Sequence, residues 1–252
     1  MVDIIMHGCN GRMGQMISGI VADDEDARIV AGIDVAGGQK NDYPVFQSID
    51  DCDIPADVVI DFGAAPAVDH LLDWCVEKQI PCVECTTGLS EEQIKHLEDC
   101  STKVAILKSA NMSLGVNVLM KLVAEAAKVF SQAGFDIEIV EKHHRMKVDA
   151  PSGTALALAD SINEAMDNKY EYVYDRSQVR QKRGSAELGI SAVRGGTIVG
   201  DHDVIFAGQD EVITFSHRAY SRAVFGNGAV QAAKFLKGKS SGHYTMKEVI
   251  EQ

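Results

Sequence analysis

Long apolar runs are missing from this sequence, although 46% of its 252 residues are hydrophobic. A membrane-spanning helix needs about 20 consecutive apolar residues, so the sequence excludes a spanning segment and a membrane partner. The first residues also lack a charged leader followed by a signal-type apolar core, and nothing in them indicates export. We therefore expect a cytoplasmic protein.

Positive charge is also scarce. Lysine and arginine number 24 against 37 aspartates and glutamates, which gives a formal net charge of −13 at pH 7 and a sequence pI near 5.0. Proteins that bind nucleic acid generally need a basic surface, so this balance argues against nucleic acid as a general partner. A short basic segment around Lys147 stands out against the acidic background.

Cysteine spacing gives no metal-binding pattern. Of the six cysteines, only Cys82 and Cys85 have motif spacing. On a strand, residues three apart face opposite sides of the sheet, and no second cysteine pair or histidine pair completes a zinc site. We therefore expect reduced, mostly packed thiols and no bound metal, with a metal or redox role for this pair as the alternative.

The first 34 residues have the pattern of a dinucleotide-binding unit. An apolar strand at residues 2–6 leads directly into a glycine loop and an amphipathic helix, with the loop sequence Gly8-Cys9-Asn10-Gly11-Arg12-Met13-Gly14. Glycines let the backbone turn tightly and approach a pyrophosphate, which the amides at the helix N-terminus then hold. A second strand at 27–33 ends at Asp34, at a spacing from Gly14 (34 − 14 = 20) that suits hydrogen bonds from an adenosine ribose. The alternative is a domain whose glycines serve packing alone.

Strands and helices alternate through the rest of the first half. Apolar strands at 57–62, 80–84 and 104–107 are separated by helical segments, which predicts a parallel sheet whose ligands lie beyond the carboxyl ends of the strands. Two segments occur there and can line a nicotinamide pocket: Cys85-Thr86-Thr87-Gly88 and Ser109-Ala110-Asn111-Met112. Ordinary polar loops fit the same spacing.

The pattern changes after a long helix at about 115–130. Strands at 190–194, 198–206 and 212–217 follow one another closely through glycine-containing turns, which is typical of antiparallel neighbours. A final helix with an apolar stripe, at 229–236, is expected to pack back on the first domain. The sequence thus predicts an α/β protein with two domains. Residues 1–113 and 223–252 form a Rossmann-type parallel-sheet dinucleotide-binding domain, and residues 114–222 form an α+β substrate-binding and oligomerisation domain with a mixed or antiparallel sheet.

The segment 141–155 combines cations, proton carriers and a helix start. Alternation at 136–140 predicts a strand, Pro151-Ser152-Gly153-Thr154 before an apolar run predicts a capped helix, and a polar loop is expected between them. The amides of Gly153 and Thr154 can bind a carboxylate, while Lys147 and His144 supply further cationic donors. The pattern indicates a site for a small dianion. A solvated basic loop is the alternative.

These residues resemble the dihydrodipicolinate reductase family over essentially the whole chain. The family signature E-x-H-H-x-x-K-x-D-A-P-S-G-T-A is matched at every fixed position by residues 141–155. The resemblance implies NAD(P)H-dependent reduction of 4-hydroxy-tetrahydrodipicolinate to tetrahydrodipicolinate, a step of the diaminopimelate pathway of lysine biosynthesis. It also implies a small cyclic imine dicarboxylate as substrate and a homotetramer built through the second domain.

The resemblance further implies roles for individual residues. His143 handles a proton, Lys147 is a proton donor, and the substrate is bound by His144, Gly153 and Thr154. The implied cofactor contacts are Gly8, Cys9, Asn10, Gly11, Arg12, Met13, Asp34, Cys85, Thr86, Thr87, Ser109, Ala110, Asn111 and Met112. One departure is Cys85, where many relatives have glycine, and a side chain there can crowd the nicotinamide ribose.

The residues fit this chemistry on their own terms. A conjugated cyclic imine with two carboxylates accepts hydride from a nicotinamide and must then take up a proton, for which histidine is suited. Asp34 binds ribose hydroxyls but repels a 2′-phosphate, so NADH should be used at least as well as NADPH unless Lys40 or Arg12 reaches the phosphate. The alternatives are another two-domain NAD(P)-dependent reductase, such as an amino-acid or semialdehyde dehydrogenase, and a non-catalytic NAD(H)-sensing regulator.

Overall fold

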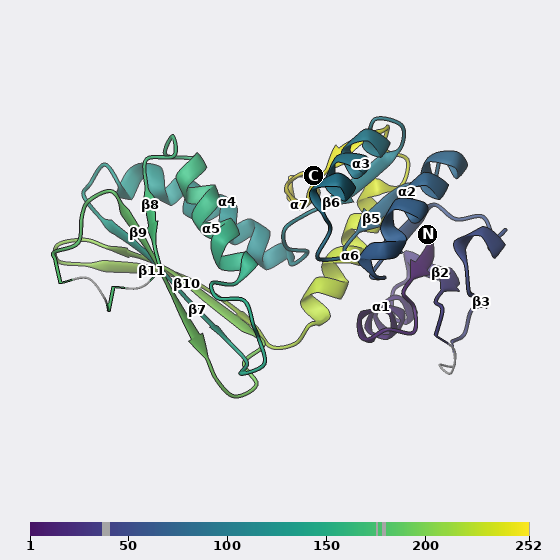
Figure 1. Ribbon diagram of the computed structural model, residues 1–252, viewed down its shortest axis with the longest axis horizontal. Helices are drawn as coiled ribbons and strands as arrows, with labels where there is room; N and C mark the ends of the chain where they lie inside the picture. Colours follow the sequence, from purple (N-terminus) through teal and green to yellow (C-terminus); the bar gives the residue numbers. More distant parts are fainter. Residues whose placement is uncertain (37–40, 175, 178–179, 252) are drawn as a thin grey trace. The chain divides into compact units, whose positions relative to one another are not determined.

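The computed structural model describes residues 1–36, 41–174, 176–177 and 180–251 (Figure 1). The chain folds into two compact units. Unit 1 comprises Met1–Ser113 and Ala223–Gln252, and unit 2 comprises Leu114–Arg222. No helix among the described residues is both long and apolar enough to cross a membrane.

Unit 1 is built on a seven-stranded sheet in which every strand pairing is parallel, as the sequence predicts. Its order is β12-β6-β5-β4-β1-β2-β3. The strands are β1 Val2–His7, β2 Ala27–Ile33, β3 Val45–Phe46, β4 Val58–Asp61, β5 Cys82–Glu84, β6 Ala105–Lys108 and β12 Gly242–Tyr244. The helices are α1 Arg12–Ala22, the 3-10 turn η1 Ile49–Asp51, α2 Ala65–Lys78, α3 Glu91–Ser101, α6 Ala223–Leu236 and α7 Met246–Ile250.

Two apolar layers enclose this sheet because the strands are buried on both faces. Ile4 and Met6 of β1 pack with α1, α6 and α7, whereas Ile5 packs with α2 and α3 on the other side. The same alternation separates Cys82 from Cys85, which join opposite layers. All six cysteines are free thiols, and five of them are buried.

The last long helix, α6, packs into the core of unit 1, which confirms the prediction from its apolar stripe. Close approach depends on Gly228. A Cβ at this position would lie 1.6 Å from the carbonyl oxygen of Met112. The helix backbone can therefore approach the Met112 carbonyl this closely only because residue 228 has no side chain.

Unit 2 has a mixed five-stranded sheet in the order β11-β10-β7-β9-β8. The strands are β7 Asp136–His143, β8 Glu171–Val173, β9 Glu187–Arg194, β10 Gly200–Ala207 and β11 Val212–Ala219, and the helices are α4 Leu114–Phe130 and α5 Gly153–Glu164. The two helices pack together over one face of the sheet (Figure 1). They bury Ile137, Ile139 and Phe206 there. Alternation puts every second residue of β7 on this covered face.

The predicted antiparallel run of three strands is only partly correct. β10 is antiparallel to β11, but β7 lies between β9 and β10 and pairs in parallel with β9. Gly195 and Gly196 therefore do not form a hairpin turn. Their backbone instead bonds to the end of β7, through Gly195 N to His143 O and Arg145 N to Gly196 O. β7 is central because both of its edges are paired, with β10 on one side and β9 on the other, so its backbone groups are satisfied inside the sheet.

We expect Gly228→Ala to lower the free energy of unfolding by about 1–3 kcal/mol, the usual cost of overpacking, measured by urea denaturation. Gly19→Ala is the matched control, since Gly19 lies on the exposed side of α1 and a Cβ there meets nothing within 4 Å. That variant should gain about 0.5–1 kcal/mol because alanine favours helices. Equal effects of the two substitutions would contradict the role given to Gly228.

Candidate active site

The site in unit 2 begins on a strand rather than in the predicted loop. β7 continues to His143, so Glu141 and His143 are its last alternate residues and both face the covered side of the sheet. The expectation of a polar loop from residue 141 onward is wrong for these two. Glu141 is completely buried and His143 is 8% exposed. A strand can end in such polar residues because their side chains find partners inside the fold.

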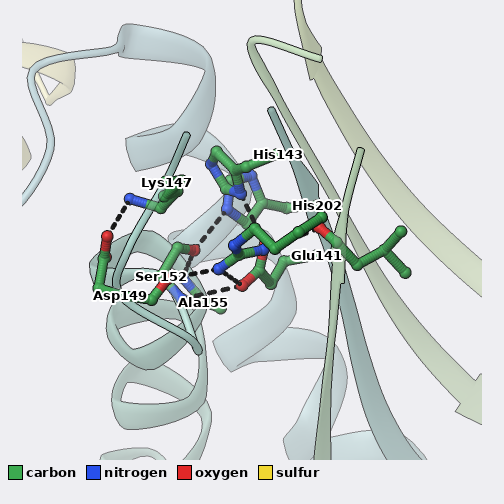
Figure 2. A network of polar contacts seen from close by, with 9 residues as sticks. Glu141, His143, Lys147, Asp149, Ser152, Ala155 and His202 are labelled. Carbon is green, nitrogen blue, oxygen red and sulfur yellow. Dashed lines mark hydrogen bonds and ion pairs between the residues drawn. The ribbon is translucent and has the colours of Figure 1, made fainter. Parts of the chain in front are cut away.

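The carboxylate of Glu141 is the centre of a hydrogen-bond network (Figure 2). Arg194, at the end of β9, donates to both of its oxygens at 2.7 Å. Nδ1 of His143 lies 2.6 Å from Oε2, and the backbone N–H of Ser152 donates to Oε1 at 3.0 Å. Three segments of unit 2 are thus tied to one carboxylate.

This network sets the charge states of its members. Burial alone would raise the pKa of Glu141, but hydrogen bonds from Arg194, His143 and the Ser152 amide outweigh it and hold that pKa below its usual range. Burial lowers the pKa of His143, assisted by the charges of Lys147 and Arg194 and opposed by Glu141. Glu141 is therefore an anion that accepts a hydrogen bond from the Nδ1–H of His143, which leaves Nε2 as the chemically available ring nitrogen.

The start of α5 adjoins this network. Ser152 is the N-cap, and its Oγ accepts from the Ala155 amide at 3.2 Å, which confirms the predicted capped helix. Gly153 and Thr154 are the first two residues of the helix, so they carry amides of its first turn. Oγ of Ser152 also hydrogen-bonds Nε2 of His202 at 3.1 Å. The His202 ring lies 5.2 Å from the His143 ring, edge to face.

Lys147 lies in the turn that follows β7, where its backbone N–H bonds to His144 O. Its ammonium is 2.8 Å from the carboxylate of Asp149, and its side chain is 22% exposed. Asp149 is half exposed, so this ion pair contributes little to stability. His144 is partly buried in the same turn.

The predicted cofactor residues lie in unit 1. Gly8 has φ +78°, and a Cβ there would lie 2.5 Å from Phe62 O, while one at Gly14 would lie 2.2 Å from Gly8 O. Both positions require glycine. α1 begins at Arg12 with no side-chain cap on Gly11 and no acidic residue in its first turn, so its amides fit a pyrophosphate.

The end of β2 supplies the acidic residue at its predicted place. The Asp34 carboxylate accepts from the Asn10 amide at 2.9 Å and from the Ala36 amide at 2.8 Å. These bonds fix it beside the glycine loop. Cys9, in contrast, is completely buried, and burial raises the pKa of its thiol to about 11, so it offers a ligand only its backbone.

The two other predicted cofactor segments follow β5 and β6. Cys85 packs toward the apolar layer of α6, Thr86 is buried, and Thr87 is exposed. After β6, Ser109 is partly buried and Ala110 is exposed, whereas Met112 joins the core. Asn111 accepts from the Ser113 amide at 2.8 Å. Both segments lie at the carboxyl edge of the sheet, where a parallel sheet binds ligands.

Glu141, Arg194, His202 and Ser152 are functional candidates that sequence reasoning missed as such. Arg194 and His202 lie 53 and 61 residues after Glu141 in the chain, and no spacing rule links them (194 − 141 = 53; 202 − 141 = 61). Glu141 and Ser152 stand at fixed positions of the motif, and that was the available signal.

Comparisons with known proteins cover the whole chain. Residues 2–112 match the family model described as dihydrodipicolinate reductase, N-terminus, and residues 115–250 match the one described as dihydrodipicolinate reductase, C-terminus. The 4-hydroxy-tetrahydrodipicolinate reductase of Caldanaerobacter subterraneus subsp. tengcongensis is 52% identical over 100% of this chain and 99% of its own length. That of Clostridium tetani is 49% identical over 98% and 96%.

A solved structure has the same fold. The dipicolinate-bound dihydrodipicolinate reductase from Paenisporosarcina sp. TG-14 aligns with a TM-score of 0.82 at 24% identity, covering 98% of this chain and 99% of that one. At this identity the likeness concerns the fold alone.

We expect Glu141→Gln to lower the pKa of His143 further, because the carboxylate is the group that favours the protonated ring. An NMR titration of the His143 ring measures this, with folding checked by circular dichroism. Glu138→Gln is the control, since Glu138 lies three residues earlier on β7, on the opposite face, and bonds to Arg183. If both variants titrate like the wild type, Glu141 does not set the charge of His143.

Proposed function

This chain belongs to the dihydrodipicolinate reductase family, and on that premise we propose that it reduces 4-hydroxy-tetrahydrodipicolinate to tetrahydrodipicolinate with a nicotinamide cofactor, in the diaminopimelate route to lysine. The observation that carries the proposal is the buried Glu141–His143 pair beside the first turn of α5. It combines a proton carrier with a carboxylate-binding helix terminus, which a small cyclic dicarboxylate needs.

Unit 2 holds the substrate through its carboxylates. The amides of Gly153 and Thr154 at the helix start bind one carboxylate, and His144 and Lys147 add cationic donors. Lys147 exchanges its contact with Asp149 for the substrate. The relative of known structure binds dipicolinate, a ring with two carboxylates, which supports this substrate class.

His143 handles the proton of the reaction. The bound cofactor supplies a hydride to the substrate ring, which then requires a proton. Glu141 fixes Nδ1, so the ring takes up a proton from solvent at Nε2 and passes it to the substrate from the same atom. The lowered pKa of His143 makes the protonated ring a stronger acid. Lys147 stabilises negative charge beside the ring and acts as a further proton donor.

Unit 1 holds the cofactor. The glycine loop and the first turn of α1 bind the pyrophosphate, from Gly8 to Met13, and Asp34 accepts from the adenosine ribose. The segments 85–87 and 109–112, at the ends of β5 and β6, bind the nicotinamide half.

The quaternary state and location are part of the same proposal. We infer a homotetramer, because the family resemblance implies one, and a cytoplasmic location, because that fits an enzyme of amino-acid biosynthesis. Exposed apolar side chains on the edge strand β11 and on α4, such as Val212 and Leu122, supply surface for such contacts.

The assay for the proposed function follows NADH and NADPH oxidation at 340 nm, with the cyclic imine generated in situ by the preceding synthase. Rapid oxidation that depends on the synthase product supports the reductase. Turnover of amino acids or semialdehydes in its place would favour the other two-domain dehydrogenases, and cofactor binding without turnover would favour a sensor.

We predict that NADH is used at least as well as NADPH. The fixed carboxylate of Asp34 repels a 2′-phosphate, and the next residue is Val35, which offers no guanidinium. Lys40 lies outside the described residues. Measured kcat/KM values decide this, and a tenfold preference for NADPH, about 1.4 kcal/mol, would refute it.

Thr154→Val should raise KM for the imine while NADH affinity holds. The substitution keeps the shape of the side chain but removes a hydroxyl donor for the substrate carboxylate. Steady-state kinetics with fluorescence titration of NADH separates the two effects. Equal losses in both would give Thr154 a structural role instead.

His143→Gln should reduce kcat by roughly 10²-fold or more with a smaller effect on substrate affinity, because it removes the titrating group and keeps a polar side chain. Lys147→Met should raise KM as well as lower kcat, since the ammonium acts on the bound substrate and on the transition state. Steady-state kinetics measures both.

The control for Lys147→Met is Lys142→Met, which removes a lysine that pairs with Asp203 on the other face of β7. It should leave substrate KM near the wild-type value. A near-normal kcat for His143→Gln would move the proton to another group, and His144 would be tested next.

A further inference from the structure

Four ionisable side chains form a row across the carboxyl end of the parallel sheet in unit 1. They are the last residues of four adjacent strands: His7 of β1, Asp61 of β4, Glu84 of β5 and Lys108 of β6. The strand register places them directly side by side. Register partners in a parallel sheet face the same side, so the four side chains meet on the face covered by α2 and α3.

Three members of this row form hydrogen bonds with Thr86, and together they engage its amide, its hydroxyl and its carbonyl oxygen. Its amide donates to Oε1 of Glu84 at 2.7 Å, and its hydroxyl donates to Oδ2 of Asp61 at 2.8 Å. Its carbonyl oxygen accepts from the ammonium of Lys108 at 3.2 Å. The fourth member, His7, lies 2.5 Å from Oδ1 of Asp61. Thr86 is the centre of the segment 85–87, so the row fixes a loop that the proposed function assigns to the cofactor.

The two carboxyl groups of the row share one negative charge. Asp61 and Glu84 are both completely buried, and two adjacent buried carboxylates repel each other strongly. Burial, then the charge of Asp61, raises the pKa of Glu84 to about 9. Burial opposes ionisation of Asp61 too, but the hydrogen bond and charge of His7 hold its pKa below the usual range. At neutral pH, Asp61 is the anion and Glu84 carries a proton.

The second oxygen of Glu84 agrees with this assignment. Oε1 accepts from the Thr86 amide, whereas Oε2 is buried and accepts no hydrogen bond from the described residues. A carboxylate would leave a charged oxygen unpaired there, while a neutral acid can donate its proton to Asp61, and that hydrogen bond also raises the pKa of Glu84.

We propose that Glu84 is a positioning residue that works in its neutral, proton-bearing form: with Asp61 it fixes Thr86 and the cofactor-binding segment 85–87, and loss of its proton loosens that segment and weakens binding of the nicotinamide nucleotide. This inference rests on the proposed function, because the cofactor is the ligand concerned.

Several other titratable groups lie near Glu84 and must be kept constant in a test. Asp61, Lys108 and Cys82 lie on the same face of the sheet as Glu84, His7 and Cys75 lie beyond Asp61 and Cys82, and Cys85 follows Glu84 on the opposite face. Replacing Glu84 alone leaves all of them in place. Glutamine has the shape of the neutral acid and cannot ionise, so Glu84→Gln isolates the proton.

The first experiment measures the dissociation constant of NADH by fluorescence at pH 7 and pH 10. In the wild type the dissociation constant should be at least threefold higher at pH 10 than at pH 7. In Glu84→Gln the ratio of the two constants should stay near one. Glu98→Gln, an exposed change on α3, is the control and should behave like the wild type. Equal ratios in the wild type and Glu84→Gln would overturn the proposal.

The second experiment needs no cofactor and follows thermal unfolding from pH 5 to pH 9. Because folding raises the pKa of Glu84, the folded chain keeps a proton that the unfolded chain releases above about 4.5. The wild type should therefore lose stability relative to Glu84→Gln as the pH rises through this range. If the difference in stability between the wild type and Glu84→Gln stays constant from pH 5 to pH 9, Glu84 is not held in its neutral form and the proposal is overturned. Failure of the wild type to bind NADH or NADPH at pH 7 would instead contradict the proposed function, while this series still tests the proton.

Discussion

The buried carboxylate of Glu141 is the interaction on which unit 2 depends. It is fully removed from water and is tolerated there only because Arg194, His143 and the Ser152 amide all bind it. Removing one partner of a buried ion pair costs about 3–5 kcal/mol of folding free energy, so the loss of any one of these groups destabilises the whole network. The same bonds that stabilise the fold also orient the ring of His143 and anchor the start of α5.

Much of this arrangement follows from local patterns in the sequence. The sequence predicted β2 with its observed bounds, the capping residues predicted the start of α5, and Asp34 lies beside the glycine loop as its spacing requires. These features depend on neighbouring residues in the chain. The chain's membership of its family was likewise readable from one motif, because its fixed positions lie within fifteen consecutive residues.

The features that the sequence did not reveal depend on distant residues or on very short elements. β7 was predicted to end before Glu141, because a run of polar residues is typical of a loop. The partner that allows Glu141 to be buried on a strand, Arg194, is distant in the sequence. β9 was placed beside β10, although β7 separates them, since local turn signals say nothing about which strand occupies the centre of a sheet. β3, β8, β12 and α7 have two to five residues and carry no readable period. The row that contains Asp61 and Glu84 takes only the last residue of each strand. These residues are far apart in the sequence, and only the strand register brings them together.

Glu141 holds His143 in one tautomer, with the proton on Nδ1 and with Nε2 left for chemistry. The most direct test is the ¹⁵N chemical shifts of the His143 ring in the folded protein at a pH where the ring is neutral. We predict a protonated, hydrogen-bonded Nδ1 and an unprotonated Nε2. A ring with its proton on Nε2, or one that exchanges freely between both tautomers, would contradict the account.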